Sequence, residues 1–461
     1  MASKGGGTLE NNTQESKGYL LPLIIIGALF FIFGFVTWVN GTLIPYLQIA
    51  CELDPFQSTL VTFAFYIAYF IMALPSSWVL GKIGYKKSMS LGLFIMAIGA
   101  AIFIPAALSR SYFTFLVGLF CQGVGLALLQ TAANPYATVL GPIESAAKRI
   151  SIMGVCNKVA GAIGTVTLAK IILSGSDELK KKLLVLTDVS EKNILLDQMA
   201  SKVIAPYIFI SIAFAVVAVL LNFSPLPEIN IEKEDPKENA SSGKSIFSYT
   251  YLVLGVIALF LYVGVEVIAG DFIIVYGTDF WNIPIGEAQN FIMYILIMMV
   301  VAYLIGATII PKYLSQENAL KICAVLGMIL VVGITFSSGL TSIYMVIGLG
   351  FANALVWPAI WPLALKDLGS HIKTGSALLI MAIVGGATLP LLYGSLSEVV
   401  GRQQAYWLMF PCYLFILFYA MKGHKMGLQK KTNNLNGGTG NSLNQPVSPS
   451  KNGKVLESVL K

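Results

Sequence analysis

Apolar residues gather in twelve long runs along the chain, and most polar residues lie between these runs. A helix that crosses a bilayer needs about 20 predominantly apolar residues, and the runs have close to that length or more. The longer runs predict helices that tilt or extend beyond the hydrocarbon core. We expect spanning helices over residues 19–47, 57–80, 88–108, 112–140, 150–173, 203–224, 248–277, 288–310, 319–338, 342–365, 374–397 and 404–421.

The composition supports an all-α integral membrane protein. Apolar residues make up 56% of the 461 positions and charged residues 11%, whereas globular proteins average about 45–50% apolar and about 25% charged residues. The five cysteines are scattered without a CxxC pair, and the chain has only two histidines. Because metal sites need clustered ligands, we expect neither a metal centre nor a cofactor.

Lysine and arginine are unevenly divided between the loops on the two sides of the predicted membrane. One set of loops, which includes Lys86 and Arg149, is rich in these residues, and so is the C-terminal tail. The opposite loops carry Arg110, Arg402 and several acids, apart from segment 174–202 with its five lysines and five acids. Positively charged loops face the cytoplasm, so we predict a multi-pass protein of the cell (plasma or inner) membrane with both termini cytoplasmic. The net charge of +7 follows from this topology and indicates no nucleic-acid partner.

A polar segment in the middle of the chain separates six apolar runs from six. The C-terminal residues are rich in Asn, Gly, Ser and Lys, a composition typical of disorder. We therefore predict a polar N-terminal tail, a six-helix bundle, a cytoplasmic linker, a second six-helix bundle and a disordered cytoplasmic tail. These parts cover residues 1–18, 19–224, 225–247, 248–425 and 426–461.

The two predicted bundles share a weak internal repeat. GLALLQTAANPYATVLG in the first and ANALVWPAIWPLALKDLG in the second each lead through a basic loop into a glycine-rich helix. Aligned on their closing Leu-Gly pairs, with one residue inserted, the segments place Gln130 opposite Trp357. Repeats related by an axis along the membrane normal are typical of secondary transporters, which bind their substrate near the midplane between the halves.

Two amide side chains lie on one face of the run 112–140. Gln130 and Asn134 are four residues apart, so they share a helix face, and Pro135 frees a backbone carbonyl one turn earlier. Amides donate and accept hydrogen bonds, as sugar hydroxyls do, so this face suits a polyhydroxylated ligand. Hydrogen bonds between helices are the alternative explanation.

A second candidate face combines an amide with indoles. Asn353, Trp357 and Trp361 recur every four residues, and indole faces stack on the apolar faces of sugar rings. Ordinary interhelical packing or an interface belt is the alternative. Polar and aromatic residues of two further runs complete the set, and we predict a sugar site formed by Trp38, Asn40, Gln130, Asn134, Asn157, Asn353 and Trp357.

Three charged residues lie inside predicted spans, where desolvation makes them costly. Lys158 lies nine residues beyond Arg149, about 13 Å deeper at 1.5 Å per residue, and it either pairs with a carboxylate or extends to the interface. Glu266 carries a proton, pairs with Lys158, or binds Na⁺ together with Asp271, because hard cations prefer oxygen ligands. We predict cation coupling by Glu266, Asp271 and Lys158, with Glu266 as the first choice and both H⁺ and Na⁺ open.

The segment TAANP (131–135), closed by VLGP (139–142), resembles the fucose:proton symporter family of the major facilitator superfamily, and within it the glucose/galactose permease branch. Supporting segments at residues 30–47, 262–267, 361–369 and 423–427 extend the resemblance over nearly all of residues 19–425. The resemblance implies a major facilitator fold, with twelve helices in two pseudo-symmetric six-helix bundles. It also implies cation-coupled sugar uptake by alternating access.

Two positions depart from the fucose permease pattern. The pattern has a glutamate before TAANP, where this chain has Gln130, and an aspartate after the asparagine of the first span, where it has Gly41 after Asn40. The resemblance links both carboxylates to proton coupling, so that mechanism does not carry over directly. The asparagine of the fifth span and the aromatic residue before proline in the tenth do match, at Asn157 and Trp357.

These observations predict a monomeric secondary active transporter and not an enzyme. We expect uptake of a hexose, glucose or galactose first, by symport with H⁺ or Na⁺ across the lipid bilayer. The alternatives are an uncoupled sugar facilitator, a permease for L-fucose or another monosaccharide, and a non-transporting membrane sugar sensor. A sensor is disfavoured because the polar C-terminal tail is too short for a signalling domain.

Overall fold

Helices make up almost all of the structure. The computed structural model describes residues 7–139, 146–227, 246–310, 312–366, 368 and 371–427, and these ranges contain no strand. They all belong to one compact unit, Met1–Gly427. The predicted linker lies mostly, and the predicted C-terminal tail almost entirely, outside the described residues, so the division into five parts stays a prediction.

The N-terminal half contains five long helices and two shorter ones. The long helices are α1 (Gly7–Ala50), α2 (Pro55–Leu108), α3 (Tyr112–Val139), α4 (Ala146–Ile172) and α7 (Ile204–Phe223). Segment 174–202, which the sequence left unexplained, forms most of the connection between α4 and α7. It contains α5 (Ser176–Val185) and α6 (Val189–Ser201).

The C-terminal half has more interruptions. Its longest helices are α9 (Thr250–Asp271), α12 (Phe291–Ile309), α13 (Gln316–Phe336), α14 (Gly339–Ala354), α15 (Val356–Leu365), α16 (Ile372–Met381), α17 (Gly385–Val400) and α19 (Met409–Met421). Short helical turns connect or precede them: η2 (Ile246–Ser248), α10 (Ile273–Val275), η3 (Tyr276–Phe280), α11 (Ile285–Ala288), η5 (Ala382–Val384), α18 (Arg402–Ala405), η6 (Tyr406–Leu408) and η7 (Gly423–Lys425).

The start and the middle of α2 follow directly from its sequence. Asp54 caps the helix by accepting a hydrogen bond from the backbone N–H of Gln57 at 2.6 Å, and the Gln57 side chain accepts one from the Asp54 N–H at 3.1 Å. This reciprocal pair satisfies two N–H groups that the first turn leaves free. Further along, Gly84 adopts φ 80° and ψ 175° and breaks the helix, a conformation that costs glycine little.

The break at Gly84 settles the number of spans. Among the described residues, eleven helical stretches are long and apolar enough to cross a membrane, and α2 is counted as one of them. The predicted spans 57–80 and 88–108 lie on either side of Gly84 inside that single stretch. The twelve predicted spans are therefore confirmed.

The tenth span is interrupted where its prolines predict a break. α14 ends at Ala354 and α15 begins at Val356. Pro358 has no N–H to donate, and its ring clashes with the carbonyl four residues earlier, which is that of Ala354. The interruption lies next to Trp357 and thus shapes the site described below.

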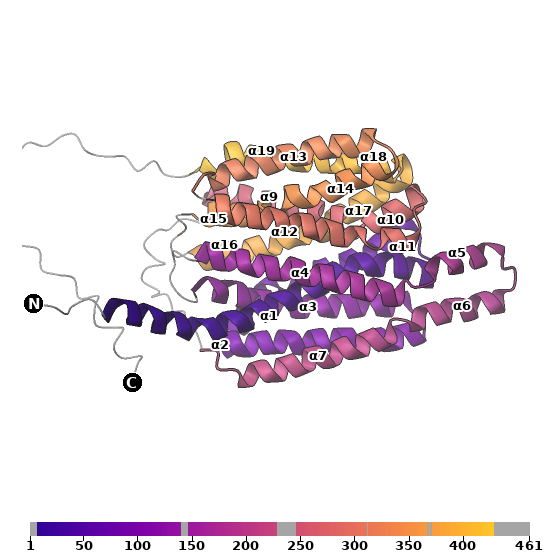
Figure 1. Ribbon diagram of the computed structural model, residues 1–461, viewed down its shortest axis with the longest axis horizontal. Helices are drawn as coiled ribbons and strands as arrows, with labels where there is room; N and C mark the ends of the chain where they lie inside the picture. The colour runs from indigo at the N-terminus through magenta and orange to yellow at the C-terminus, as the bar shows by residue number, and fades with distance from the viewer. Residues whose placement is uncertain are drawn as a thin grey trace, which may run out of the picture. The chain divides into compact units, whose positions relative to one another are not determined.

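The two halves lie side by side in Figure 1, with α1–α7 in indigo to pink and α9–α19 in salmon to yellow. Within the N-terminal half α2 packs on α3 and α7, and α1 packs on α4. Within the C-terminal half α9 packs on α17, and α13 packs on α14 and α19. Between the halves α2 packs against α17 and α4 against α12.

Candidate functional site

A cavity of about 160 Å³ lies between the two halves. The N-terminal half contributes lining residues from α1, α2, α3 and α4, and the C-terminal half contributes them from α9, α12, α15 and η5. Eight of the ten residues predicted from the sequence line it: Trp38, Gln130, Asn134, Asn157, Lys158, Glu266, Asp271 and Trp357. The residues that line this cavity come from eight separate predicted spans and therefore meet at one place.

The two remaining predicted residues, Asn353 and Asn40, do not line the cavity. Asn353 is buried, and its side-chain oxygen accepts a hydrogen bond from the Tyr413 hydroxyl at 2.7 Å. This bond joins α14 to α19 and matches the helix–helix alternative for that residue. Asn40 is also buried and is absent from the cavity lining, but its Nδ2 has no hydrogen-bond partner within the described residues.

The amides of α3 and α4 face the cavity with unused hydrogen-bonding capacity. Gln130 and Asn134 are half-buried there, and within the described part of the chain neither forms a side-chain hydrogen bond. Asn157 donates to the Phe30 carbonyl of α1 at 3.5 Å, a long contact. Three amides from neighbouring helices are thus available to a ligand with hydroxyl groups.

Aromatic rings form much of the remaining wall. Trp357 stacks on Trp361 with ring centroids 5.4 Å apart and an interplanar angle of 22°. The other rings include four tyrosines that the sequence analysis did not single out, Tyr66, Tyr69, Tyr262 and Tyr303. The only signal they give in the sequence is a hydroxyl-bearing ring inside an apolar run. Tyr66 and Tyr69 are three residues apart and therefore share one helix face.

Lys158 and Glu266 form an ion pair across the cavity. The distance from Lys158 Nζ to Glu266 Oε1 is 3.1 Å, and the two side chains are only 10% and 15% exposed. The same ammonium lies 4.4 Å from the centroid of the Trp38 ring, which adds a cation–π contact. The predicted pairing is confirmed, and the alternative that Lys158 extends to the interface is wrong. The pair joins α4 of one half to α9 of the other.

Asp271, the last residue of α9, has a different environment. It is 2% exposed, and its Oδ2 has no hydrogen-bond partner among the described residues. It lies against Gly41 of α1, where a Cβ would be 3.0 Å from the Asp271 Cα and 3.3 Å from its Oδ1. A side chain at position 41 would therefore crowd this carboxylate, so glycine is the residue that fits.

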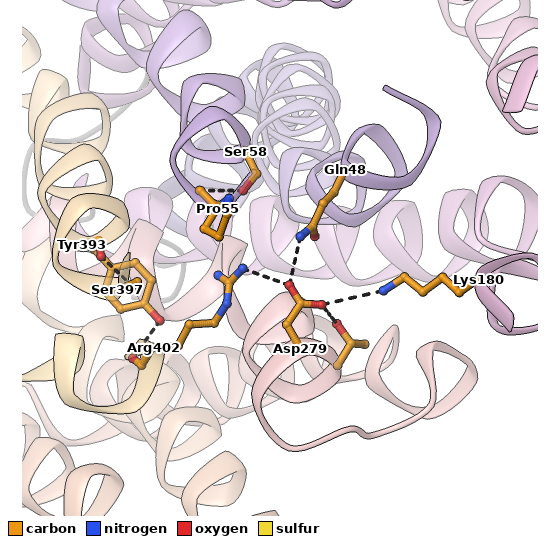
Figure 2. Close-up of polar contacts among 9 residues, drawn as sticks. Gln48, Pro55, Ser58, Lys180, Asp279, Tyr393, Ser397 and Arg402 are labelled. Atoms are coloured by element: carbon orange, nitrogen blue, oxygen red, sulfur yellow. Dashed lines mark hydrogen bonds and ion pairs between the residues drawn. The ribbon is translucent and has the colours of Figure 1, made fainter. Parts of the chain in front are cut away.

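A second polar cluster joins the two halves at the end of the molecule that carries α5, α6 and α11 (Figure 2). Asp279 Oδ2 accepts hydrogen bonds from Gln48 at 3.0 Å and from Arg402 at 2.9 Å, and Oδ1 lies 3.7 Å from Lys180 Nζ. We call Gln48, Lys180, Asp279 and Arg402 the Asp279 network. Gln48 and Lys180 belong to the N-terminal half, whereas Asp279 and Arg402 belong to the C-terminal half.

The connection between α4 and α7 adds a further contact at this end. Asp177 in the first turn of α5 accepts hydrogen bonds from the backbone N–H groups of Ile285 at 2.9 Å and Gly286 at 3.2 Å. Arg402 is held in place because its carbonyl accepts a hydrogen bond from the Tyr393 hydroxyl at 3.2 Å. Asp279 and Arg402 are 123 positions apart in the chain and lie in predicted loops, so the sequence gives no sign of their contact.

The fold and the cavity between its halves define a membrane transporter with an internal repeat. The family model described as "Major Facilitator Superfamily" matches residues 26–387, and the chain belongs to this family. The predicted fold class is therefore confirmed.

Relatives of the chain carry names that refer to sugars. It is 35% identical over 419 residues to the "Glucose/galactose transporter" of Brucella abortus, covering 90% of this chain and 97% of the relative. It is 31% identical over 423 residues to the "Putative glucose/galactose transporter" of Helicobacter pylori, covering 89% and 99%. It is 28% identical over 400 residues to the "L-fucose-proton symporter" of Escherichia coli, covering 86% and 91%.

A solved structure shows the same architecture. The crystal structure of the Major Facilitator Superfamily transporter FucP in the outward conformation superposes with a TM-score of 0.68 at 28% sequence identity. The match covers 87% of this chain and 98% of the other. The arrangement of the helices is therefore shared over nearly the whole described part of the chain.

Proposed function

We propose that the protein takes up a hexose, glucose or galactose first, by symport with protons through alternating access. The observation that carries this proposal is the cavity between the halves, where unpartnered amides, aromatic rings and membrane-buried charges meet. The names of the relatives support a sugar as substrate, and the name of the E. coli relative supports a proton as the coupling ion.

The cavity has the chemistry that a hexose needs. Gln130, Asn134 and Asn157 offer donors and acceptors to the hydroxyl groups, and Trp357 offers a ring face to the apolar side of the sugar. Trp38 of the N-terminal half also lines the cavity. Because the residues come from both halves, a bound sugar contacts both, and its binding energy can favour the conformations in which the halves close around it.

Protons suit the buried charges better than Na⁺ does. The Glu266 carboxylate already has the Lys158 ammonium at 3.1 Å, which would repel a second cation at the same place. We therefore prefer H⁺ over Na⁺ as the coupling ion.

An uncoupled facilitator is the second candidate. Gly41 and Gln130 stand where the fucose permease pattern has carboxylates, which favours transport without a coupling ion. The two candidates differ in one respect: only a symporter accumulates sugar against its gradient.

Uptake into sealed vesicles separates these functions. Radiolabelled glucose, galactose and L-fucose are offered with an inward proton gradient, with an inward Na⁺ gradient, or with neither. We expect accumulation of a hexose above its external concentration under the proton gradient alone, and its loss when a protonophore is added. Simple equilibration under every condition would support the facilitator, and no sugar entry at all would support the non-transporting sensor.

The proposed location is the cell membrane, with both termini in the cytoplasm and the protein acting as a monomer. The Asp279 network then lies at the extracellular end, and the linker lies on the opposite side. Single cysteines at positions 180 and 237, introduced into a cysteine-free variant, should react with an impermeant thiol reagent from opposite sides of the membrane. Labelling of both positions from one side would overturn this topology.

A further inference from the structure

The two acidic residues of α9 differ in a way that assigns them separate tasks. We infer that Asp271 binds and releases the coupling proton, whereas Lys158 and Glu266 hold the two halves together without exchanging a proton. This inference rests on the proposed proton symport and replaces Glu266 as the first choice for the coupling residue.

Glu266 is poorly placed to exchange a proton. Its Oε1 lies 3.1 Å from Lys158 Nζ, inside a cavity where both side chains are largely shielded from water. Protonation of Glu266 would leave a buried ammonium without a counter-charge, and breaking a buried pair from one side is strongly unfavourable. The pair therefore stays charged, and it links α4 to α9 for as long as the halves are close.

Asp271 has the opposite properties. It is 2% exposed, no lysine or arginine of the described chain forms an ion pair with it, and its Oδ2 has no hydrogen-bond partner there. A buried carboxylate without a partner becomes neutral because its charged form loses hydration without compensation. In the conformation of this structure, Asp271 therefore holds a proton.

The surroundings of Asp271 contain no other group that would take over this proton. The titratable residues that share its cavity are one paired lysine, one paired glutamate and four phenols: Lys158, Glu266, Tyr66, Tyr69, Tyr262 and Tyr303. On the side of α1 and α12, Gly41 and Ile292 lie beside it, and neither can be ionised. Tyr393 of α17, whose ring packs on Phe272, donates a hydrogen bond to the Arg402 carbonyl.

The position of Asp271 connects its proton to the movement of the halves. The end of α9 touches α1 directly, because Gly270 lies against the Trp38 ring and Asp271 against Gly41. α1 belongs to the N-terminal half and α9 to the C-terminal half, so Asp271 lies on the interface that must separate during alternating access. When it separates, water reaches the carboxylate and the proton can leave; when it closes, the carboxylate is dry and keeps its proton.

Asp271→Asn tests this assignment, because asparagine keeps the size of the side chain and cannot release a proton. In vesicles we expect loss of proton-driven hexose accumulation, while exchange of labelled for unlabelled hexose at equal concentrations continues. Exchange by the wild-type protein should depend on pH, and exchange by Asp271→Asn should not. Retained exchange also shows that the variant is folded.

The matched control removes the ion pair completely. Lys158→Met combined with Glu266→Gln leaves no unpaired buried charge. Because the pair lines the cavity, the rate of hexose exchange by this double variant can differ from that of the wild-type protein. Exchange should keep its dependence on pH, and any hexose transport should still be driven by a proton gradient, because Asp271 is intact.

The same experiments separate failure of this inference from failure of the proposed function. If the wild-type protein exchanges hexose but never accumulates it, proton symport itself is wrong. If the wild-type protein and Asp271→Asn both accumulate hexose, symport stands and only the assignment to Asp271 fails. If Asp271→Asn shows no exchange activity, the double variant decides: loss of its proton-driven accumulation while exchange continues would show that the assignment to Asp271 is wrong.

Discussion

Two polar regions join the halves of this transporter, and they are built differently. In the central cavity one lysine meets one glutamate at 3.1 Å, with side chains 10% and 15% exposed. In the Asp279 network, Gln48 and Lys180 of one half contact a carboxylate that Arg402 of its own half also binds (Figure 2). The Lys180 side chain is 37% exposed, against 22% for Asp279 and 10% for Arg402. Both regions bridge the same two halves, but they differ in how well water can replace the contacts.

This difference indicates two kinds of connection. Water compensates the partners of a half-exposed ion pair when it opens, so such a pair contributes about 0–1 kcal/mol. A buried pair has no such compensation, and removal of one partner costs about 3–5 kcal/mol. The Asp279 network is thus suited to repeated opening and closing, whereas the Lys158–Glu266 pair fixes the geometry of the cavity.

Breaking the buried pair from one side should have the largest effect. We expect Lys158→Ala to destabilise the protein by about 3–5 kcal/mol, because it leaves the buried Glu266 side chain without its partner. Thermal unfolding of the detergent-solubilised protein measures this, and hexose exchange shows the loss of transport. The double variant Lys158→Met, Glu266→Gln should recover most of the stability, and a double variant as unstable as Lys158→Ala would contradict a buried pair.

The aromatic wall should give the next largest effect. Trp357→Ala removes the ring that we place against the sugar and should weaken hexose affinity by about 1.5 kcal/mol, roughly tenfold. Binding of labelled hexose to the purified protein measures the change. Trp361→Phe is the matched control, because Trp361 stacks behind Trp357 and does not line the cavity. Equal losses in both variants would indicate a packing effect and not a sugar contact.

A single amide should matter less than the indole. Gln130→Ala removes one neutral hydrogen bond to the sugar and should cost on the order of 1 kcal/mol, several-fold in affinity. Asn353→Ala serves as the comparison, since Asn353 bonds to Tyr413 outside the cavity lining; its effect should fall on thermal stability and not on affinity. Unchanged affinity in both Gln130→Ala and Trp357→Ala would place the sugar elsewhere.

The Asp279 network should give the smallest effect. We expect Lys180→Met, which removes the exposed ion pair between the halves, to shift the conformational balance by about 1 kcal/mol or less towards the state open at this end. The readout is the rate at which an impermeant thiol reagent labels a cysteine at position 37, which lines the cavity. Asp197→Asn is the control, because its ion pair with Arg110 at 3.2 Å lies within one half. Equal labelling rates in the two variants would contradict a latch between the halves.

Sequence patterns predicted the fold because the bilayer imposes a simple rule on them. Every spanning helix needs a long apolar run, so the twelve runs gave the twelve spans, and Pro358 gave the break between α14 and α15. The charges inside the runs predicted the Lys158–Glu266 pair, because a membrane-buried ammonium needs a partner. The apolar runs and Pro358 are local signals in the sequence. The ion pair follows from the free-energy cost of burying a charged side chain in the membrane.

The features that the sequence did not reveal depend on contacts between distant segments. Gln48 and Asp279 are 231 positions apart, and Arg402 and Asp279 are 123 apart, so loop charges gave no indication of a common network. The four cavity tyrosines resemble ordinary packing residues within apolar runs. Periodicity placed Asn353 and Trp357 on one face, but the break at Leu355 lies between them, and Asn353 bonds to Tyr413 instead of lining the cavity.

The pH of a weakly buffered vesicle suspension tests the central claim most directly, that hexose and proton enter together through the cavity. Hexose is added to de-energised vesicles, and the external pH is recorded. We predict a transient alkalinisation that scales with the amount of hexose, appears with the wild-type protein and disappears with Asp271→Asn. Entry of labelled hexose into wild-type vesicles without any change of external pH would contradict the account.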